Sequence, residues 1–253
     1  MKRMIKMTLI LLLVGMAVVA AVPFLKEKEA EKKSEKEFEN IQESVAEKKD
    51  KTMNVTKLKG ENEDCIGYLE VPGTTISYPV MQTRDNPDFY LNHDFNKNYS
   101  FYGTPYLSAY CDLKKSDNLI IYGHNINGGK MFGALEQYKN KDFFDRHRKI
   151  FFTTDRRRKY EVFAVMSVNI RDFEYWKFVM ARDEKYYDKF VEKVLEHSLW
   201  SAGKKSKYGE QMLMLSTCDN GKGDDWRIVV VGKSAFNFKQ NANRKRIKSR
   251  RSR

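Results

Sequence analysis

From residue 65 onward the chain is a succession of short apolar runs separated by turn residues, and this pattern constrains the fold most. Each run has the length of a strand and is too short for a typical helix. Pro72 and Gly73, between the first two runs, form a turn signal. Eight short strands predict a mostly β domain, a closed or nearly closed barrel without unpaired sheet edges. The runs lie at residues 66–71, 75–81, 103–110, 118–122, 149–154, 160–169, 211–217 and 227–232.

Helices are predicted among and before these strands. Residues 129–138 fit a short helix, whereas residues 86–98 form an irregular loop rich in aromatic side chains. Within an insertion at 171–200, apolar residues repeat at helical spacing, which predicts a helix over residues 184–199. The repeating residues are Tyr187, Phe190, Val191, Val194 and Leu195.

The segment ahead of the barrel is charged and rich in helix formers. Residues 27–51 carry Phe38, Ile41 and Val45 at helical spacing, which predicts an amphipathic helix whose narrow apolar face leans on the core. A solvated spacer fits the same composition. Residues 50–64 are polar and are expected to be the linker into the barrel.

Residues 7–25 are nineteen residues without a charge, preceded by Lys2, Arg3 and Lys6. A membrane-spanning helix needs about 20 apolar residues, whereas the core of a signal peptide needs only about 7–15. The length therefore favours an uncleaved transmembrane anchor, with a cleaved signal peptide as the alternative. Lysines follow the segment as densely as positive charges precede it, so the charge rule does not choose an orientation.

The net charge of +13 lies mostly at the two ends of the chain. Three cations precede the apolar segment and eight follow Phe238, which leaves about +2 for the remainder. A nucleic-acid-binding function would rest on this tail alone, and we do not expect it. The predicted organisation is a basic flank (1–6), an anchor (7–25), a charged helix and linker (26–64), the barrel (65–238) and a polybasic tail (239–253).

Cys218 ends the strand predicted at 211–217, where a thiol is held rigidly and still faces solvent. Arg227 opens the next run, so the two residues are expected on neighbouring antiparallel strands. A guanidinium beside the sulfur favours the thiolate, which is the form that attacks a carbonyl carbon. Of the four histidines, His124 has the matching position at the end of the strand predicted at 118–122. A cysteine nucleophile with a histidine base is therefore predicted.

The remaining histidines and cysteines have simpler explanations. His93 lies in the irregular loop, His147 is expected to pack near two phenylalanines, and His197 lies on a polar helix face. Cys65 and Cys111 lack the spacing of metal ligands, and no metal site is predicted. They are expected to be free thiols, although a disulfide between them fits an exported protein.

Three sequence motifs occur in order at strand ends: YGHN at 122–125, LSTC at 215–218 and Arg227 nine residues beyond the cysteine. Together they resemble the sortases, membrane-anchored cysteine transpeptidases of Gram-positive bacteria built on an eight-stranded barrel. The stretch from 122 to 147, with GHNINGGKMFGALEQY and FFDRH, resembles class B in particular. The inserted helix and the helix before the barrel resemble that class too, and the resemblance covers about residues 65–233.

The resemblance implies that Cys218 is the nucleophile, His124 the acid and base, and Arg227 the stabiliser of the transition state. It implies no cofactor. The implied substrates are surface proteins with a C-terminal sorting motif of the Asn-Pro type, which are transferred to a peptidoglycan amine. Asn92, Ser216 and Thr217 are the positions matched to substrate binding, with the inserted helix as one wall. The implied location is the cell membrane, with a single span and an extracellular catalytic domain.

Two other functions stay open at this point. A membrane-tethered binding module would use the cations of residues 239–253 to hold an anionic polymer such as teichoic acid. A hydrolytic cysteine peptidase would use the same Cys218 and His124, and would differ only in what resolves the thioester.

Overall fold

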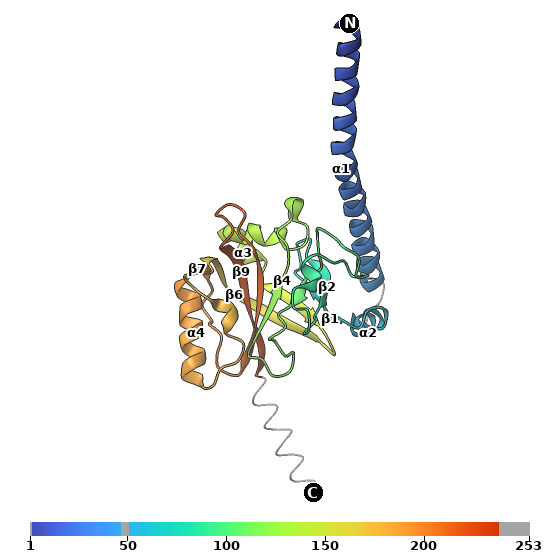
Figure 1. Cartoon of the computed structure of the whole chain (residues 1–253). Helices are drawn as coiled ribbons and strands as arrows, with labels where there is room; N and C mark the ends of the chain where they lie inside the picture. Colours follow the sequence, from blue (N-terminus) through green and yellow to red (C-terminus); the bar gives the residue numbers. More distant parts are fainter. Residues whose placement is uncertain (1, 47–50, 238–253) are drawn as a thin grey trace.

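The computed structural model describes residues 2–46 and 51–237, and Figure 1 shows the arrangement of its elements. Two helices at the N-terminus, α1 (Lys2–Ala46) and α2 (Lys51–Glu61), precede a strand-rich body that also contains α3 (Lys141–Arg146) and α4 (Glu184–Glu196). The strands of this body are β1 (Cys65–Glu70), β2 (Ser77–Met81), β3 (Tyr106–Leu107), β4 (Asn118–Tyr122), β5 (Lys149–Thr153), β6 (Arg157–Asn169), β7 (Ser198–Ser201), β8 (Glu210–Cys218) and β9 (Trp226–Asn237).

Eight of these strands form a closed barrel. They are hydrogen-bonded in the order β5-β1-β2-β3-β4-β8-β9-β6, and a further pairing of β5 with β6 closes the ring. The predicted barrel and its eight strands are therefore confirmed. β7 was not predicted as a strand; it pairs with β6 outside the ring. Its four residues alternate between half-buried and exposed positions, so they lack the apolar run of the barrel strands.

β8 is the most enclosed strand near the functional residues. It pairs in parallel with β4 on one side and antiparallel with β9 on the other. Every residue from Gln211 to Thr217 is buried, and Cys218 is the first exposed residue of the strand. Burial on both faces explains the continuous apolar character of this run and fixes the place where the cysteine reaches solvent.

The charged segment before the barrel leans on the core, as expected. Phe38 of α1 is buried edge-on against Tyr78 of β2, with ring centroids 5.5 Å apart, and Ile41 is buried beside it. The side chain of Val45 lies outside the described residues. The prediction of a linker at residues 50–64 is wrong for residues 51–61, because these residues form the helix α2. Val55 and Leu58 are buried, and this packing makes a polar segment helical.

The predicted membrane anchor at residues 7–25 falls within α1, and part of its side chains lies outside the described residues. Among the helices of the described residues, none is long and apolar enough to span a membrane. The structure thus does not confirm the anchor. The polybasic tail at 239–253 lies outside the described residues as well.

The inserted helix is confirmed as α4, which ends at Glu196 rather than at residue 199 because Ser198 begins β7. Asp183 caps its first turn by accepting a hydrogen bond from the backbone N–H of Tyr186 at 2.7 Å. The helix expected at 129–138 is instead a 3₁₀ helix, η3 (Gly133–Lys139), preceded by the turn η2 (Asn127–Gly129). The irregular loop at 86–98 contains one 3₁₀ turn, η1 (Phe89–Leu91).

Candidate active site

The ends of three neighbouring strands bring Cys218, His124 and Arg227 together. In the antiparallel β8–β9 pair, Cys218 lies directly opposite Arg227. In the parallel β4–β8 pair, Tyr122 lies opposite Ser216. His124 and Cys218 are each two residues beyond those partners, so the two strands deliver them to the same end of the barrel.

These residues line a groove of about 560 Å³, the catalytic groove. Its lining residues come from strand ends and from separate loops of the chain. Aromatic residues that sequence analysis did not single out supply much of its wall: Tyr106, Tyr110, Tyr122 and Trp176.

Cys218 is chemically distinct from the other two cysteines. All three are free thiols, but Cys65 and Cys111 are fully buried while Cys218 is exposed. Burial raises the pKa of the Cys65 and Cys111 thiols to about 11 each, so both stay protonated near neutral pH. A thiol reagent in solution is therefore expected to react with Cys218 and not with the two buried cysteines. The expectation of free thiols at 65 and 111 agrees with the structure.

The imidazole of His124 is held by the loop at 86–98. Its Nε2 lies 2.9 Å from the carbonyl oxygen of Leu91. Because a carbonyl only accepts, Nε2 carries a proton in this contact, and Nδ1 of the neutral ring is left as an acceptor. Phe101 stacks nearly parallel to the ring, with centroids 6.3 Å apart. Within the described residues, a backbone carbonyl rather than a carboxylate thus orients the imidazole of His124.

Arg227 is anchored by its own turn. One terminal nitrogen, Nη1, donates to the carbonyl oxygens of Asp224 at 2.5 Å and Trp226 at 2.9 Å. The carboxylate of Asp225 instead pairs with Arg171 at 2.7 Å. Main-chain carbonyls therefore fix one edge of the guanidinium, which leaves its other donors for the groove that Arg227 lines.

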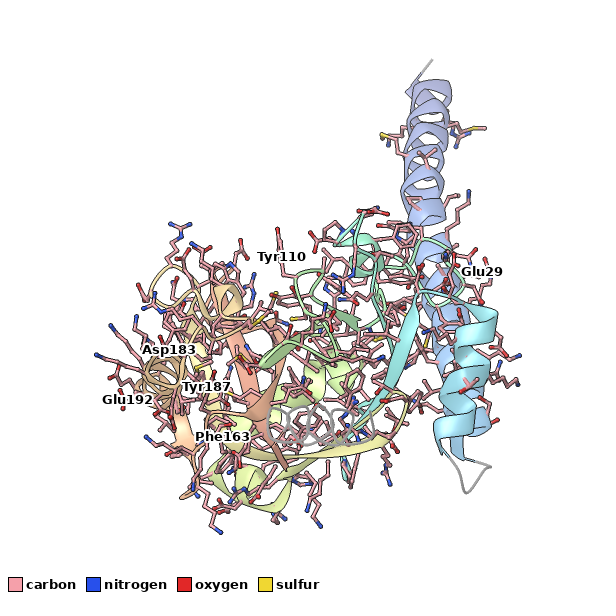
Figure 2. The ribbon with its side chains drawn as sticks, turned by 90° about the horizontal axis from the view of Figure 1, so that it is seen from below. Glu29, Tyr110, Phe163, Asp183, Tyr187 and Glu192 are labelled. Atoms are coloured by element: carbon pink, nitrogen blue, oxygen red, sulfur yellow. The ribbon has the colours of Figure 1, made fainter. Side chains whose placement is uncertain are left out.

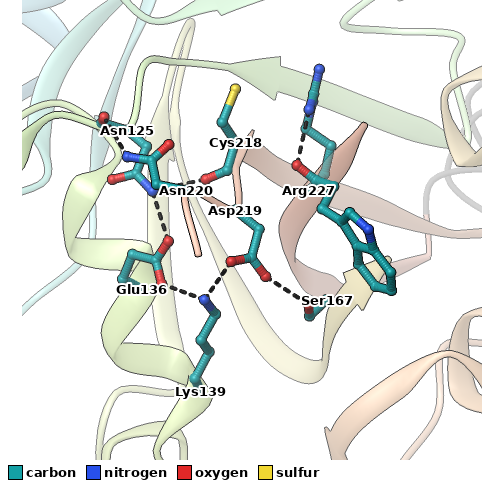
Figure 3. A network of polar contacts seen from close by, with 9 residues as sticks. Asn125, Glu136, Lys139, Ser167, Cys218, Asp219, Asn220 and Arg227 are labelled. Atoms are coloured by element: carbon teal, nitrogen blue, oxygen red, sulfur yellow. Dashed lines mark hydrogen bonds and ion pairs between the residues drawn. The ribbon is translucent and has the colours of Figure 1, made fainter. Parts of the chain in front are cut away.

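The side-chain amide of Asn125 ties the end of the strand that carries Cys218 to the loop that carries His124 (Figure 3). The Nδ2 of Asn125 donates to the carbonyl oxygen of Cys218 and to Oε1 of Glu136, each at 2.8 Å. Asn220 adds a longer bond of 3.3 Å to the carbonyl oxygen of Asn125. Asn125, the residue after His124, is therefore bonded to the backbone of Cys218, and Asn220, two residues after Cys218, is bonded to the backbone of Asn125.

Beneath this contact lies an ion-pair network centred on the fully buried Asp219 (Figure 3). Its carboxylate accepts from Lys139 Nζ at 2.5 Å and from Ser167 Oγ at 2.6 Å. Lys139 also pairs with Glu136 at 2.6 Å. Burial acts to raise the pKa of Asp219, but the Lys139 and Ser167 hydrogen bonds outweigh it and lower that pKa. Burial likewise opposes the charge of Lys139, and its two carboxylate partners hold its pKa above the ordinary value.

The positions matched to substrate binding divide into two groups. Ser216 and Thr217 line the catalytic groove, but both side chains are buried and bonded. The Ser216 hydroxyl is 2.7 Å from that of Tyr175, and Thr217 Oγ1 donates to the Gly123 carbonyl oxygen at 2.7 Å. Asn92 is exposed at the end of η1 and is not a lining residue, whereas its neighbour Leu91 is one.

The inserted segment contributes a wall through a turn rather than through its helix. Trp176, from the turn η4 (Tyr175–Lys177), lines the catalytic groove, and no residue of α4 is among the described lining residues. The expectation that the helix forms the wall is therefore wrong in this detail. Tyr175 explains the placement, because its buried hydroxyl contact with Ser216 holds η4 against β8.

The other histidines are packing residues. His93 stacks on Phe89 and His147 on Phe143, each with ring centroids 3.8 Å apart. His197 stacks on Phe173 at 4.8 Å. In each case the ring's Nδ1 also contacts a backbone carbonyl four residues earlier. These histidines are outside the set of residues that line the catalytic groove.

Comparison with known proteins identifies similar chains. The model of the family described as Sortase domain matches residues 69–235. Sortase B of Listeria monocytogenes is 31% identical over 192 residues, 73% of this chain and 74% of the relative. Sortase B of Staphylococcus aureus is 30% identical over 180 residues, 70% of this chain and 72% of the relative. The X-ray structure of a mutant form of Clostridium perfringens sortase B is 28% identical, has a TM-score of 0.72, and the match covers 79% of this chain and 97% of that one.

Proposed function

The chain belongs to the sortase family, class B, whose members are cysteine transpeptidases, and from this premise we propose that Cys218, His124 and Arg227 perform its reaction. The single observation that supports these roles is their convergence in one groove, with Cys218 opposite Arg227 across β8 and β9. Cys218 is also the exposed thiol among the three cysteines.

The proposed reaction has two acyl transfers. The Cys218 thiolate attacks a peptide carbonyl, and the oxyanion that forms accepts hydrogen bonds from the free donors of Arg227. As the C–N bond breaks, imidazolium of His124 donates its proton to the departing amine, which leaves a thioester on Cys218. The acceptor amine then attacks the thioester, its proton passes to His124, and the thiolate of Cys218 is released.

We propose that the donor is a surface protein with a C-terminal sorting motif of the Asn-Pro type, and that the acceptor is a peptidoglycan amine. The aromatic lining of the catalytic groove, which comes from several separate segments, supports a peptide donor with apolar side chains. Leu91, Trp176 and Tyr110 are the exposed or half-buried side chains that offer apolar contacts to it, and Ser216 and Thr217 shape its floor.

The proposed location is the outer face of the cell membrane. Its support is the uncharged run at residues 7–25, whose length approaches that of a membrane span. An extracellular catalytic domain would place Cys218 beside both the donor and the peptidoglycan acceptor.

Peptide cleavage with and without an amine acceptor tests this function. The full chain, in detergent, is incubated with an Asn-Pro-type sorting peptide and with or without an oligoglycine amine, and products are identified by mass spectrometry. We expect a ligated product with the amine, slow hydrolysis without it, and neither with Cys218→Ala. Cys65→Ala is the matched control, because it removes a thiol that is buried outside the catalytic groove.

Two results would contradict the proposal. Hydrolysis that the amine does not divert would make the protein a peptidase. Unchanged behaviour of the Cys218→Ala variant in every assay would favour the binding module that uses the polybasic tail.

A further inference from the structure

A second, basic groove lies on the inserted segment, on the side of the barrel away from α1. Its volume is about 430 Å³. Figure 2 shows Asp183 and Glu192, from this region, on the opposite side of the molecule from Glu29 of α1, and Figure 1 shows α4 in the same relation to α1. Five cations and two carboxylates line this basic groove: Arg171, Lys177, Arg182, Lys189, Lys193, Asp172 and Glu174.

The floor of the basic groove is rigid and aromatic. Phe178 and Phe190 are both buried and stacked, with ring centroids 3.8 Å apart and planes inclined by 7°. Phe173 packs against Phe190 at 5.7 Å. These contacts fix α4 against the loop that follows β6, so the groove is preformed rather than assembled by a ligand.

The cations on the loop and those on the helix differ in their partners. Arg171 pairs with Asp225, Lys177 with Glu174 at 2.8 Å, and Arg182 with the adjacent Asp183 at 3.5 Å. Lys189 and Lys193 are exposed, and neither has an ion pair within the described part of the chain. They are four residues apart on one face of α4, a spacing at which like charges destabilise a helix. Apart from the position of Lys193 in the last turn of α4, where a cation suits the helix dipole, the fold gains little from these two charges.

We propose that the basic groove binds a linear polyanion with repeated phosphodiester groups. Residues four apart on a helix have Cβ atoms roughly 5–6 Å apart, so Lys189 and Lys193 face successive charges of a chain better than one compact anion. Arg171 and Arg182 provide planar forks of donors that match phosphate oxygens. Because Arg171, Lys177 and Arg182 are already paired with carboxylates, the positive field of the groove toward such a chain comes mainly from Lys189 and Lys193.

The occupant is a polymer rather than a bilayer surface. A bilayer at the N-terminal end of α1 would not face a groove that lies across the barrel from this helix (Figure 1). The turn η4 supplies Trp176 to the catalytic groove and Lys177 to the basic groove. A bound polymer therefore runs beside the catalytic groove without entering it, and holds the enzyme against an anionic wall matrix. This binding does not depend on the proposed transpeptidation.

The test compares two double variants of the full chain with the same change in net charge. Lys189→Gln with Lys193→Gln removes the two cations of the basic groove that have no ion pair in the described part of the chain. Lys185→Gln with Lys204→Gln neutralises two exposed lysines outside this groove and is the control. The probe is a fluorescent poly(glycerol phosphate) oligomer, with affinity measured by anisotropy across a salt series. Polyglutamate and phosphatidylglycerol vesicles are the comparison ligands, and all variants retain residues 239–253.

We expect the groove variant to bind the oligomer roughly 10- to 30-fold more weakly at low salt, as for the loss of two cations near an anionic surface. We also expect a shallower dependence on salt, little effect of the control, and cleavage of a sorting peptide unchanged in both. Equal losses in the two variants would mean that only net charge matters, and no loss would assign binding elsewhere; either overturns the proposal. A larger loss for vesicles or polyglutamate than for the oligomer would overturn the phosphodiester assignment.

Discussion

The side chain of Asn125 donates a hydrogen bond to the carbonyl oxygen of Cys218 at 2.8 Å, so the residue after the proposed base holds the backbone of the proposed nucleophile. A second bond from the same amide nitrogen to Glu136 fixes its direction. The separation of Cys218 and His124 therefore depends on a contact between the end of β8 and the loop after β4, in addition to the strand pairing.

Asn125→Ala should lower turnover more than substrate binding. Without the amide, the backbone of Cys218 loses its bond to the residue after His124, and small displacements of reacting groups cost on the order of 10²-fold in rate. We expect kcat to fall by roughly 10- to 100-fold with little change in KM for the donor peptide. Asn220→Ala, which removes only a 3.3 Å contact, is the control. A KM effect without a kcat effect would instead place Asn125 in substrate binding.

Alkylation at Cys218 should inactivate the enzyme selectively. At pH 7 to 8, the exposed thiol reacts while Cys65 and Cys111, with pKa values raised to about 11 by burial, do not. Iodoacetamide at one equivalent should abolish peptide cleavage, with peptide mass spectrometry locating a single adduct. If activity disappears together with modification of Cys65 or Cys111, the assignment of the nucleophile is wrong.

Arg227→Lys should behave unlike a conservative change. Lysine keeps the charge but lacks the fork that bonds two backbone carbonyls with one edge and leaves donors for the groove. Loss of one oxyanion donor costs about 10²–10³ in rate. We expect a decrease of that order for Arg227→Lys and at least as much for Arg227→Ala, in steady-state cleavage assays. Full activity in the alanine variant would exclude Arg227 from the mechanism.

Asp219→Asn should destabilise the fold in a pH-dependent way. The neutral amide loses the ion pair with Lys139, which remains partly solvated, so we expect a loss of about 1–3 kcal/mol at pH 7. The folded-state pKa of Asp219 is lowered, so its contribution is present above the unfolded value of about 3.9 and is lost as pH falls through the folded one. Urea unfolding should show a difference between variant and wild type that is constant from pH 7 to 5 and shrinks in stronger acid. A constant difference at all pH values would contradict this.

Glu37→Gln should remove a pH dependence of stability between about 4.5 and 7. Burial and the neighbouring Asp94 raise the pKa of Glu37 to about 7, and its carboxyl accepts from Asn96 at 2.7 Å. For an acid whose folded-state pKa is raised, the folded state holds the extra proton, so stability falls as pH rises through this window. Thermal unfolding at pH 5 and 7.5 should therefore differ less in the variant than in the wild type. Glu39→Gln, an exposed neighbour, is the control.

The sequence by itself determined the eight barrel strands and the three proposed catalytic residues, but not β7. These rest on local signals: β8 is buried on both faces and so has a continuous apolar run, and His124, Cys218 and Arg227 each mark the end or start of such a run. The helix α4 was equally visible, because its buried residues recur at helical spacing.

Only the tertiary structure decided what depends on contacts between distant segments. Helix α2 lies in a polar stretch and is helical because Val55 and Leu58 pack on the barrel. The link from Asn125 to Cys218 joins residues 93 positions apart, and that from Lys139 to Asp219 residues 80 apart. Hydrogen bonds over such separations leave no periodicity in the chain. The barrel brings these partners within bonding distance, whereas the stacking of Phe178 on Phe190 places the loop cations beside Lys189 and Lys193 of α4.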